Sequence, residues 1–443
     1  MFENLFKLAE AEGLSALEIY TAKSNSTEIS IYDQKVEKFE KSDLKGISFR
    51  AIYKGKQGTT FTEKYQSSMD LKIINELKTN AELITSSESI IFNEKQEEFK
   101  NIKTYYENLE SISVQDITKQ MLDLELKIKK ASDKIEQVSD IGFSLNSSTV
   151  EIINSYGVKA KRKTNNYFLY AQIVLKDQNE VETNFNYHIG KELTDFKEAE
   201  FIEKLVDEGL AKLHATKLKT SNYPVIIKNT AMNSLLSFIA SAVNAEQVLK
   251  GLSIFNDKLN SKVFDEKISI VDDPFIEEGL SKIICDDEMV ATKVKNVVDS
   301  GVLKTFLHNL KTAKELGLEP TGNGFKSSYA TSVNVRPTNF YIKPGEKSYD
   351  DLIKEMNNGF IITELSGLHA GMNALTMNFS LQTRGFEVVD GKITRSINLV
   401  IAAGNLLELL KDQVQTVGSD LKFSFGGIGS PSIYFKELQI TGE

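Results

Sequence analysis

Apolar side chains in the first part of the chain recur at two spacings, one typical of helices and one typical of strands. Residues 2–9 carry apolar positions at helical spacing. Strand-like runs follow at 27–39 and 46–53, and the second turns through a Lys-Gly-Lys-Gln-Gly segment into 59–62. A second helix with one apolar face is predicted at about 68–84. The pattern therefore predicts a helix–strands–helix unit.

The same order of elements recurs further along the chain. A helix is predicted at about 117–131, strands at 142–145, 149–153 and 167–175, and a closing helix at 201–213. The two halves also share a local echo, Asn-Ser-Thr-Glu-Ile at 25–29 and Asn-Ser-Ser-Thr-Val-Glu-Ile at 146–152. A duplicated unit explains this echo, and so does chance, because short polar segments often resemble one another.

Beyond a polar stretch at 217–222, the best candidate for a linker, the chain changes character. A strand at 224–227 and a helix at about 230–243 come first. Further strands are predicted at 268–271, 303–307, 332–335, 359–363, 379–386 and 393–401. Asp390-Gly391 is a strong hairpin signal and Ser300-Gly301 a weaker one. We predict an α+β protein with an N-terminal domain of helices and antiparallel strands (1–218) and a C-terminal β-rich domain with a few helices (222–443).

The charge balance argues against nucleic acid as a partner. The 443 residues include 53 Lys and Arg against 62 Asp and Glu, a net charge of −9. Non-specific nucleic-acid binding depends on clustered cations. The one basic run, at 159–163, is interpreted as the solvated end of a strand pair.

Cys285 is the only cysteine, so an intramolecular disulfide is impossible and a reducing compartment is favoured. Because it directly follows Ile283 and Ile284, it is expected to be a small core residue. The first residues lack the pattern of a signal peptide. Apolar runs such as 397–403 are much shorter than the ~20 residues of a spanning helix. We expect a cytoplasmic protein with no membrane partner.

Two acidic clusters offer candidate chemistry, Asp272-Asp273 and Asp286-Asp287-Glu288. Paired carboxylates could hold a divalent cation. The interpretation we favour is that both form exposed turns after strands, where Asp caps the backbone. The glycine-rich segments 322–324 and 426–429 match no phosphate-binding pattern and are expected to be tight turns.

Four segments in the last third carry a resemblance: 316–324, 367–373, 385–393 and 403–412. Their order and spacing resemble the TldD/PmbA family, whose members are often labelled modulators of DNA gyrase and are understood as peptidases. The likeness covers nearly the whole chain and is sharpest over 256–412.

Catalytic members of the family carry His-Glu-x-x-x-His on the first helix of the C-terminal domain, shortly before a Lys-Gly pair. With Lys250-Gly251 as the marker, the matching positions are Leu236, Ser237 and Ser241. The family's third ligand, a cysteine near the C-terminus, falls where this chain reads Leu-Lys-Phe-Ser-Phe-Gly-Gly at 421–427. The resemblance therefore implies a PmbA/TldE-type member with no catalytic residues, metal or cofactor of its own, and zinc only in a TldD-type partner.

The remaining site residues rest on the same resemblance. The segment 367–373 looks like its PmbA-type counterpart, and we expect it to contact a peptide or a partner chain through His369, Gly371 and Asn373. Gly322, Asn323 and Gly324 are assigned to the same contact. A loop histidine bonded to the backbone is the alternative for His369.

Three functions stay open. The first is a non-catalytic subunit of a cytosolic zinc metallopeptidase acting on unfolded peptides, inactive without a TldD-type homologue. The second is a stand-alone homodimer that binds peptides without cutting them. The third is a hydrolase with a serine nucleophile, for which Ser237, Ser241 or Ser424 would need a base.

Overall fold

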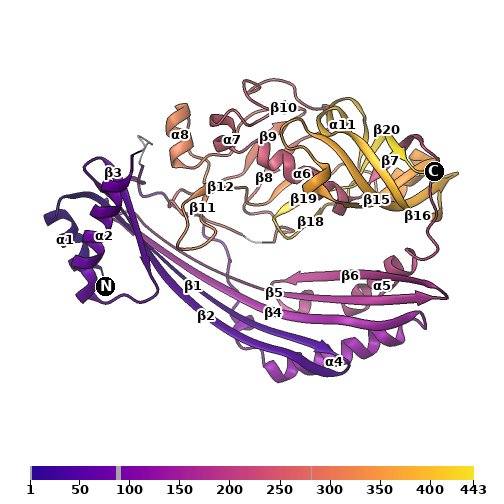
Figure 1. Ribbon diagram of the computed structural model, residues 1–443, viewed down its shortest axis with the longest axis horizontal. Coiled ribbons are helices and arrows are strands. Elements are labelled where there is room, and N and C mark those ends of the chain that lie inside the picture. Colours follow the sequence, from indigo (N-terminus) through magenta and orange to yellow (C-terminus); the bar gives the residue numbers. More distant parts are fainter. Residues whose placement is uncertain (1, 86–90, 281) are drawn as a thin grey trace. The chain divides into compact units, whose positions relative to one another are not determined.

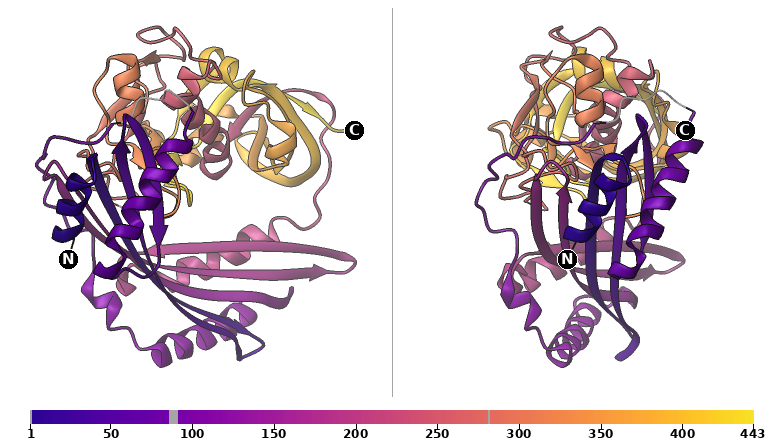
Figure 2. Two further views of the ribbon diagram at one scale, coloured as in Figure 1. Left: turned by 60° about the vertical axis from the view of Figure 1, so that its left-hand side comes forward. Right: turned by 90° about the vertical axis from the view of Figure 1, so that its left-hand side faces the viewer.

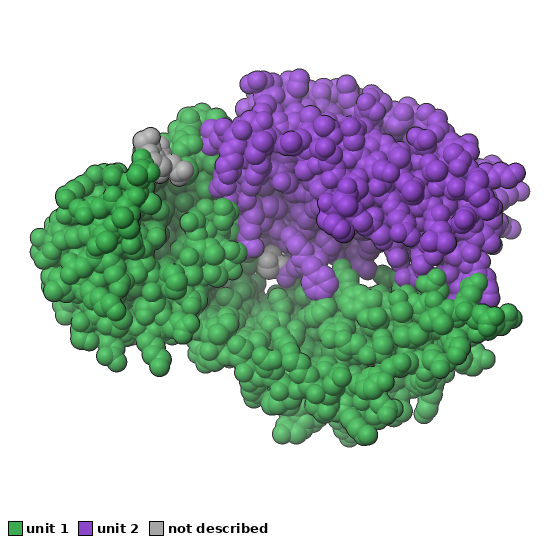
Figure 3. Space-filling model, in the orientation of Figure 1, with its two compact units in different colours: residues 1–210, 282–292, 308–334 green, residues 211–281, 293–307, 335–443 purple. Residues whose placement is uncertain are grey.

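The computed structural model describes residues 2–85, 91–280 and 282–443. The chain forms two compact units, coloured separately in Figure 3. Unit 1 comprises residues 1–210, 282–292 and 308–334, and unit 2 comprises 211–281, 293–307 and 335–443. Two segments that follow the expected linker therefore pack with the N-terminal part of the chain. Among the described residues, no helix has the length and apolar character needed to cross a membrane.

Unit 1 is built on one six-stranded antiparallel sheet with the order β3-β2-β1-β4-β5-β6. Its strands are β1 (Leu14–Tyr32), β2 (Lys35–Tyr53), β3 (Lys56–Thr62), β4 (Ile135–Asn154), β5 (Lys159–Asp177) and β6 (Glu180–Gly190). Several are long and bend along their length (Figure 1, Figure 2).

The predicted single strand at 27–39 is wrong, because a hairpin turn divides it. Asp33 and Gln34 form the turn with φ of 47° and 57°. Neither is glycine, so the usual sequence signal of a two-residue hairpin is missing. Conversely, the two strands predicted at 142–145 and 149–153 are parts of the single strand β4.

Helices cover one face of this sheet. They are α1 (Glu3–Ala11), α2 (Asp70–Leu83), α4 (Val114–Lys130) and α5 (Glu198–Leu210), with a short α3 (Glu107–Glu110) and 3-10 turns at Ser67–Met69 and Leu193–Asp195. At one end, α1 and α2 pack on odd-numbered residues of β1 and β2 such as Ile19 and Phe49. Towards the other end, Asn184 and Asn186 of β6 donate to carbonyls of α5. Strand side chains alternate between faces, so the even-numbered residues of β1 point away from the helices.

The arrangement of unit 1 is what a duplicated unit predicts. The order α1-β1-β2-β3-α2 is repeated by α4-β4-β5-β6-α5, and the sheet is symmetric about the β1–β4 pair. The two copies of the sequence echo lie side by side there, since Asn25 pairs with Ser147 and Ser26 with Asn146.

Unit 2 contains most of the shorter elements. Its strands are β7 (Ser221–Ile227), β8 (Ile270–Asp272), β9 (Lys295–Asp299), β10 (Val302–Leu303), β13 (Phe340–Ile342), β14 (Gly359–Ser366), β15 (Asn378–Val389), β16 (Lys392–Asn405), β17 (Val414–Val417), β18 (Lys422–Phe423), β19 (Ile428–Ser430) and β20 (Ile433–Thr441). Its helices are α6 (Asn229–Ala242), α7 (Ala245–Leu249), α9 (Tyr349–Met356), α10 (Leu368–Gly371) and α11 (Leu406–Asp412). Three further elements lie in or at the border of the segment 308–334, which belongs to unit 1. The strand β11 (Gly324–Phe325) pairs with β12 (Asn334–Val335), and α8 spans Leu310–Leu316.

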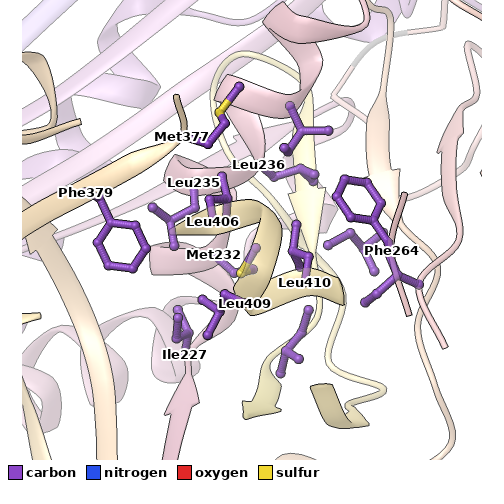
Figure 4. Packing of buried hydrophobic residues seen from close by; sticks show 14 of the residues in the cluster. Ile227, Met232, Leu235, Leu236, Phe264, Met377, Phe379, Leu406, Leu409 and Leu410 are labelled. Atoms are coloured by element: carbon purple, nitrogen blue, oxygen red, sulfur yellow. The ribbon is translucent and has the colours of Figure 1, made fainter. Parts of the chain in front are cut away.

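The strands of unit 2 form two six-stranded sheets, β16-β15-β14-β7-β20-β17 and β10-β9-β8-β13-β19-β18. Because β16 also pairs with β20, five strands of the first sheet close into a ring. Both predicted hairpins are confirmed, at Asp390-Gly391 and Ser300-Gly301. The apolar stripe of α6 lies in the main core of the unit (Figure 4). The α+β class is confirmed.

Candidate functional site

The helix α6 carries a polar stripe opposite its apolar one. Four polar side chains follow one another at four-residue spacing and share a face of the helix: Asn229, Asn233, Ser237 and Ser241. The first two are buried and the last two exposed. This face includes two of the three positions that match the family's zinc motif.

The buried half of the stripe is bonded to the segment 420–432. Asn229 donates through its backbone N–H to Ser432 Oγ (3.1 Å) and through Nδ2 to Asp420 Oδ2 (3.0 Å). Asn233 Nδ2 donates to the carbonyl of Lys422 (2.9 Å). The helix and the segment expected to supply the third zinc ligand are therefore held together, as a metal site on them would require.

The side chains in this place do not fit zinc. Leu236 is fully buried among apolar residues of the core (Figure 4). Ser237 donates its hydroxyl to the carbonyl of Ser234 (2.7 Å), and neutral serines are not zinc ligands. Cys285 belongs to unit 1, whereas α6 belongs to unit 2. In the parts of the chain that are described, no three His, Cys, Asp or Glu side chains are placed to hold a metal ion.

The serine-nucleophile alternative has no geometric support. Ser424 Oγ donates to the carbonyl of Ile428 (3.1 Å), as Ser237 does to its own helix. Over residues 2–85, 91–280 and 282–443, no histidine hydrogen-bonds to Ser237, Ser241 or Ser424. A serine hydroxyl without a base is a weak nucleophile.

His369 lies exposed on the short helix α10. Among the described residues its ring makes no hydrogen bond, so the alternative of a backbone-bonded loop histidine is not what the structure shows. Gly367 begins the turn with φ of 78°, and a Cβ on Gly371 would lie 2.3 Å from the carbonyl oxygen of Ser380. The glycines thus allow a tight loop that presents His369 outward.

Asn373 closes the same loop. Its Oδ1 accepts the backbone N–H groups of Leu375 and Thr376, both at 3.0 Å. Asn405 Nδ2 fixes the far side by donating to the carbonyl of Thr376 (2.8 Å) and to Asn378 Oδ1 (2.8 Å). Asn373 therefore positions the loop, and contact with a peptide or partner stays a prediction for His369, Gly371 and Asn373.

Gly322, Asn323 and Gly324 are buried in unit 1, whereas the His369 loop belongs to unit 2. Gly324 donates its N–H to Asp286 Oδ2 (2.9 Å), and a Cβ there would lie 2.5 Å from Glu288 Oε2. Buried residues cannot present themselves to a partner without rearrangement. We therefore assign these three a packing role beside the acidic segment and keep the contact prediction for the His369 loop alone.

The acidic cluster 286–288 is not an exposed turn, and that expectation is wrong. Asp286, Asp287 and Glu288 are all at most 3% exposed. Asp286 accepts three backbone N–H groups, from Glu288, Val290 and Gly324, each at 2.9 Å. Its carboxylate is thus used to order the segment.

Asp287 forms an ion pair with Arg162 of the basic run. Arg162 also donates to the carbonyl of Cys285 (3.0 Å), and its guanidinium lies 5.9 Å from the ring centre of Phe325. The expectation of a solvated run is confirmed for Lys161 and Lys163, which are exposed, and wrong for Arg162. Side chains alternate along β5, so Arg162 faces the opposite side of the sheet from its neighbours.

A second ion pair, absent from the sequence prediction, completes this buried network. Arg50 Nε and Nη2 donate to the two carboxylate oxygens of Glu18 (both 3.1 Å). Their only sequence signal is a charged residue between apolar ones in each strand. Lys326 adds a third cation and donates to Ser48 Oγ (3.0 Å).

Four carboxyl groups in this network, Glu18, Asp286, Asp287 and Glu288, thus face three cations. Burial raises the pKa of Glu288 to about 7, against the opposing effect of Arg50. Burial also raises the pKa of Asp286, and repulsion from Glu288 adds to the increase. Asp286 accepts three backbone N–H groups, whereas Glu288 accepts one, from Leu310 (2.7 Å), and such donors favour the ionised form of a carboxyl group. We therefore assign to Glu288 the proton that balances the fourth carboxyl group.

For the other acidic pair, the expectation of an exposed turn is wrong for Asp272, whereas Asp273 is half-buried and caps a turn. Asp272 is fully buried, forms an ion pair with Lys295 (2.8 Å) and accepts from Thr338 N and Oγ1 (2.7 and 2.8 Å). Only Asp273 caps a turn, through the N–H of Phe275 (2.8 Å).

Cys285 is confirmed as a buried core residue, and burial raises the pKa of its thiol to about 11.

Comparisons with known proteins show which family the chain resembles. Three domain models match in order: PmbA/TldA metallopeptidase domain 1 (17–80), central domain (107–213) and C-terminal domain (220–442). A metalloprotease PmbA homolog of Buchnera aphidicola is 28% identical, with the match covering 70% of this chain and 67% of that protein.

Two crystal structures share the fold along the whole chain. A proposed modulator of a DNA gyrase from Thermotoga maritima has a TM-score of 0.91 and 29% identity over 99% of both chains. TldE from Thermococcus kodakarensis has the same TM-score at 23% identity, over 100% of both chains, and shows the fold alone.

Proposed function

Because this chain belongs to the PmbA/TldD metallopeptidase family, we propose that it is a PmbA/TldE-like subunit of a cytoplasmic zinc metallopeptidase that acts on unfolded peptides. In this proposal the chain cuts nothing by itself, and a TldD-type homologue supplies the zinc. The main observation in support is made on α6. The three positions that match the family's zinc motif are Leu236, Ser237 and Ser241, although the helix itself is present.

Two features support retention of a binding role without catalysis. The α6 helix is hydrogen-bonded to the segment 420–432, so the elements that would surround a metal are held together although the ligands are absent. The His369 loop is exposed and is closed by the hydrogen bonds of Asn373, as expected for a surface that contacts a partner or a peptide. One fold can host different functions, so a member without metal ligands can keep the fold and take another role.

The test is reconstitution. The chain and a TldD-type homologue from the same organism are purified separately, mixed, and assayed for cleavage of unfolded casein and for complex formation by light scattering. We expect a complex that cleaves, a chain that is inactive alone, and weaker complex formation or cleavage in His369→Ala than in the exposed control Lys392→Ala. Cleavage by the chain alone would refute the proposal. A homodimer that binds peptide and ignores the homologue would instead favour the stand-alone function.

A further inference from the structure

The face of the unit 1 sheet that points away from the helices differs from end to end. At one end, residues such as Glu18, Tyr20 and Ile152 are buried with the segments 282–292 and 308–334, around the charged network. Further along the strands, a hollow of about 350 Å³ opens on the sheet.

The hollow is lined by residues of four neighbouring strands, which apart from the exposed Leu44 are small and polar and which we call the polar band. Its lining residues are Ser24, Asn25, Ser26, Ser42, Leu44, Asn146, Ser147, Ser148, Thr164, Asn165 and Asn166. The band is in register, since Ser42 pairs with Ser26, Ser26 with Asn146, and Asn146 with Asn166. It contains no charged residue, in a chain of which 26% is charged. The sequence echo at 25–29 and 146–152 thus marks a shared polar surface.

Most of this hydrogen-bonding capacity is unused. In the described residues, the side chains of Ser24, Ser26, Ser42, Ser148 and Asn166 have no hydrogen-bond partner. By contrast, the side chain of Asn165 points to the other face of the sheet. There its Oδ1 accepts the backbone N–H of Tyr106 and its Nδ2 donates to the carbonyl of Tyr106 (both 2.8 Å). A row of free hydroxyl and amide groups can both donate to and accept from a ligand.

An aromatic surface continues the band along β5 and β6. Residues at every second position of a strand share a face, so Phe168 and Tyr170 lie on the same face as Asn166. Their rings pack with Phe185 and Tyr187 of β6, with centroids 5.4 to 6.1 Å apart. Phe185 remains 45% exposed. This four-ring tile can contact apolar side chains of any sequence.

We propose that the polar band and the aromatic tile form a binding site for the main chain of an extended, unfolded peptide. This inference rests on the proposed function and locates substrate binding on the sheet of unit 1, outside α6 and the His369 loop. An unfolded peptide presents alternating N–H and carbonyl groups, which uncharged hydroxyls and amides satisfy without regard to side-chain charge. Because no charged residue lines the hollow, the polar band accepts many sequences, and the tile adds affinity through apolar side chains.

The test measures peptide binding by the purified full chain. Fluorescence anisotropy follows a fluorescein-labelled, uncharged 15-residue peptide of Ser, Ala, Val and Tyr, titrated with wild type, with the double variant Asn146→Ala and Asn166→Ala, and with Phe185→Ala. We expect each variant to weaken binding about tenfold, in line with loss of about two hydrogen bonds or one aromatic contact. The control Asn101→Ala, an exposed asparagine elsewhere in unit 1, should bind as wild type does.

Thermal midpoints equal to wild type exclude misfolding, and Phe185→Ala gives an independent readout if the double variant unfolds. Equal affinity of wild type and both variants would overturn the inference while leaving partner-dependent cleavage, and with it the proposed function, intact. No binding by wild type would also overturn it. Displacement of the peptide by maltoheptaose at similar concentration would show a carbohydrate surface instead and likewise overturn it.

Discussion

The acidic cluster of unit 1 and the polar stripe of α6 in unit 2 are opposite cases of a candidate metal site. The cluster has the right oxygen ligands, but backbone N–H groups, Arg162 and a proton already satisfy them. The stripe lies where the family's zinc motif belongs, and its frame is intact, but its side chains cannot bind zinc.

The difference shows that neither composition nor position is enough to make a metal site. Carboxylates that are buried and paired contribute to holding segments together, because an unpaired buried charge is costly. A helix in the right place without ligands keeps a structural role, because α6 still holds the segment 420–432 through hydrogen bonds. The following predictions separate these two situations.

Arg162→Ala should have the largest effect on stability. It leaves the buried carboxylate of Asp287 without its cation, and loss of one partner of a buried pair costs about 3–5 kcal/mol. Urea unfolding of the variant should show that loss, whereas the exposed neighbour Lys161→Ala should change stability by less than about 0.5 kcal/mol. Equal effects of the two substitutions would show that the network of unit 1 is not a stabilising core.

Asp420→Ala should have an intermediate effect, through the frame around α6. Asp420 accepts Ser432 N (2.8 Å), Ser432 Oγ (2.7 Å) and Asn229 Nδ2, and its loss leaves buried donors unpaired. The expected cost is about 1–3 kcal/mol in urea unfolding, against almost none for the exposed Glu437→Ala. A neutral result would mean that the frame does not depend on these bonds.

Glu288→Gln should change the pH dependence of stability more than stability itself. The folded protein holds the Glu288 proton up to about pH 7, whereas the unfolded chain loses it near 4.5. The contribution of this group is therefore greatest below 4.5 and is lost as pH rises to about 7. Between pH 5 and 8, the thermal midpoint of wild type should fall relative to that of Glu288→Gln.

The exposed Glu200→Gln serves as the matched control and should follow wild type across this range. Parallel curves for wild type and Glu288→Gln would contradict the assignment of the proton to Glu288.

The smallest effect is expected for nucleic acid. Arg162 is occupied by Asp287, so only the three exposed lysines of the basic run remain to meet phosphate. Two of them, Lys161 and Lys163, already pair with glutamates. Duplex DNA should bind more weakly than about 1 μM at physiological salt. The double variant Lys161→Gln and Lys163→Gln should bind no differently. Tight binding that these substitutions abolish would show that the exposed side of β5 is a nucleic-acid surface.

Much of the fold can be predicted from local sequence patterns, whereas the burial of charged residues cannot. The apolar stripe at 230–243 and the Asp390-Gly391 turn are each determined by neighbouring residues, so both were predicted. Asp287 and Arg162 are far apart in sequence, and their pairing depends on contacts that only the folded chain makes. The turn at Asp33-Gln34 was missed because its residues adopt positive φ without glycine.

For the candidate site, the sequence predicts the absence of zinc ligands on α6 but not the hollow on the sheet of unit 1. The sequence of α6 contains no histidine, so the absence of ligands holds however the chain is aligned with the family's zinc motif. The polar band, by contrast, exists only because four strands align their serines and asparagines. The echo at 25–29 and 146–152 was its one local trace.

The most direct test of the central claim is the zinc content of this chain. It should be purified alone and together with a TldD-type homologue, without chelators, and measured by inductively coupled plasma mass spectrometry. The account predicts less than about 0.1 zinc per chain alone and about one zinc per homologue in the complex, all of it lost when the histidines of the homologue are replaced. The account would be contradicted if the chain alone held one zinc tightly and if the variant Cys285→Ser, in which α6 keeps its wild-type sequence, retained that zinc.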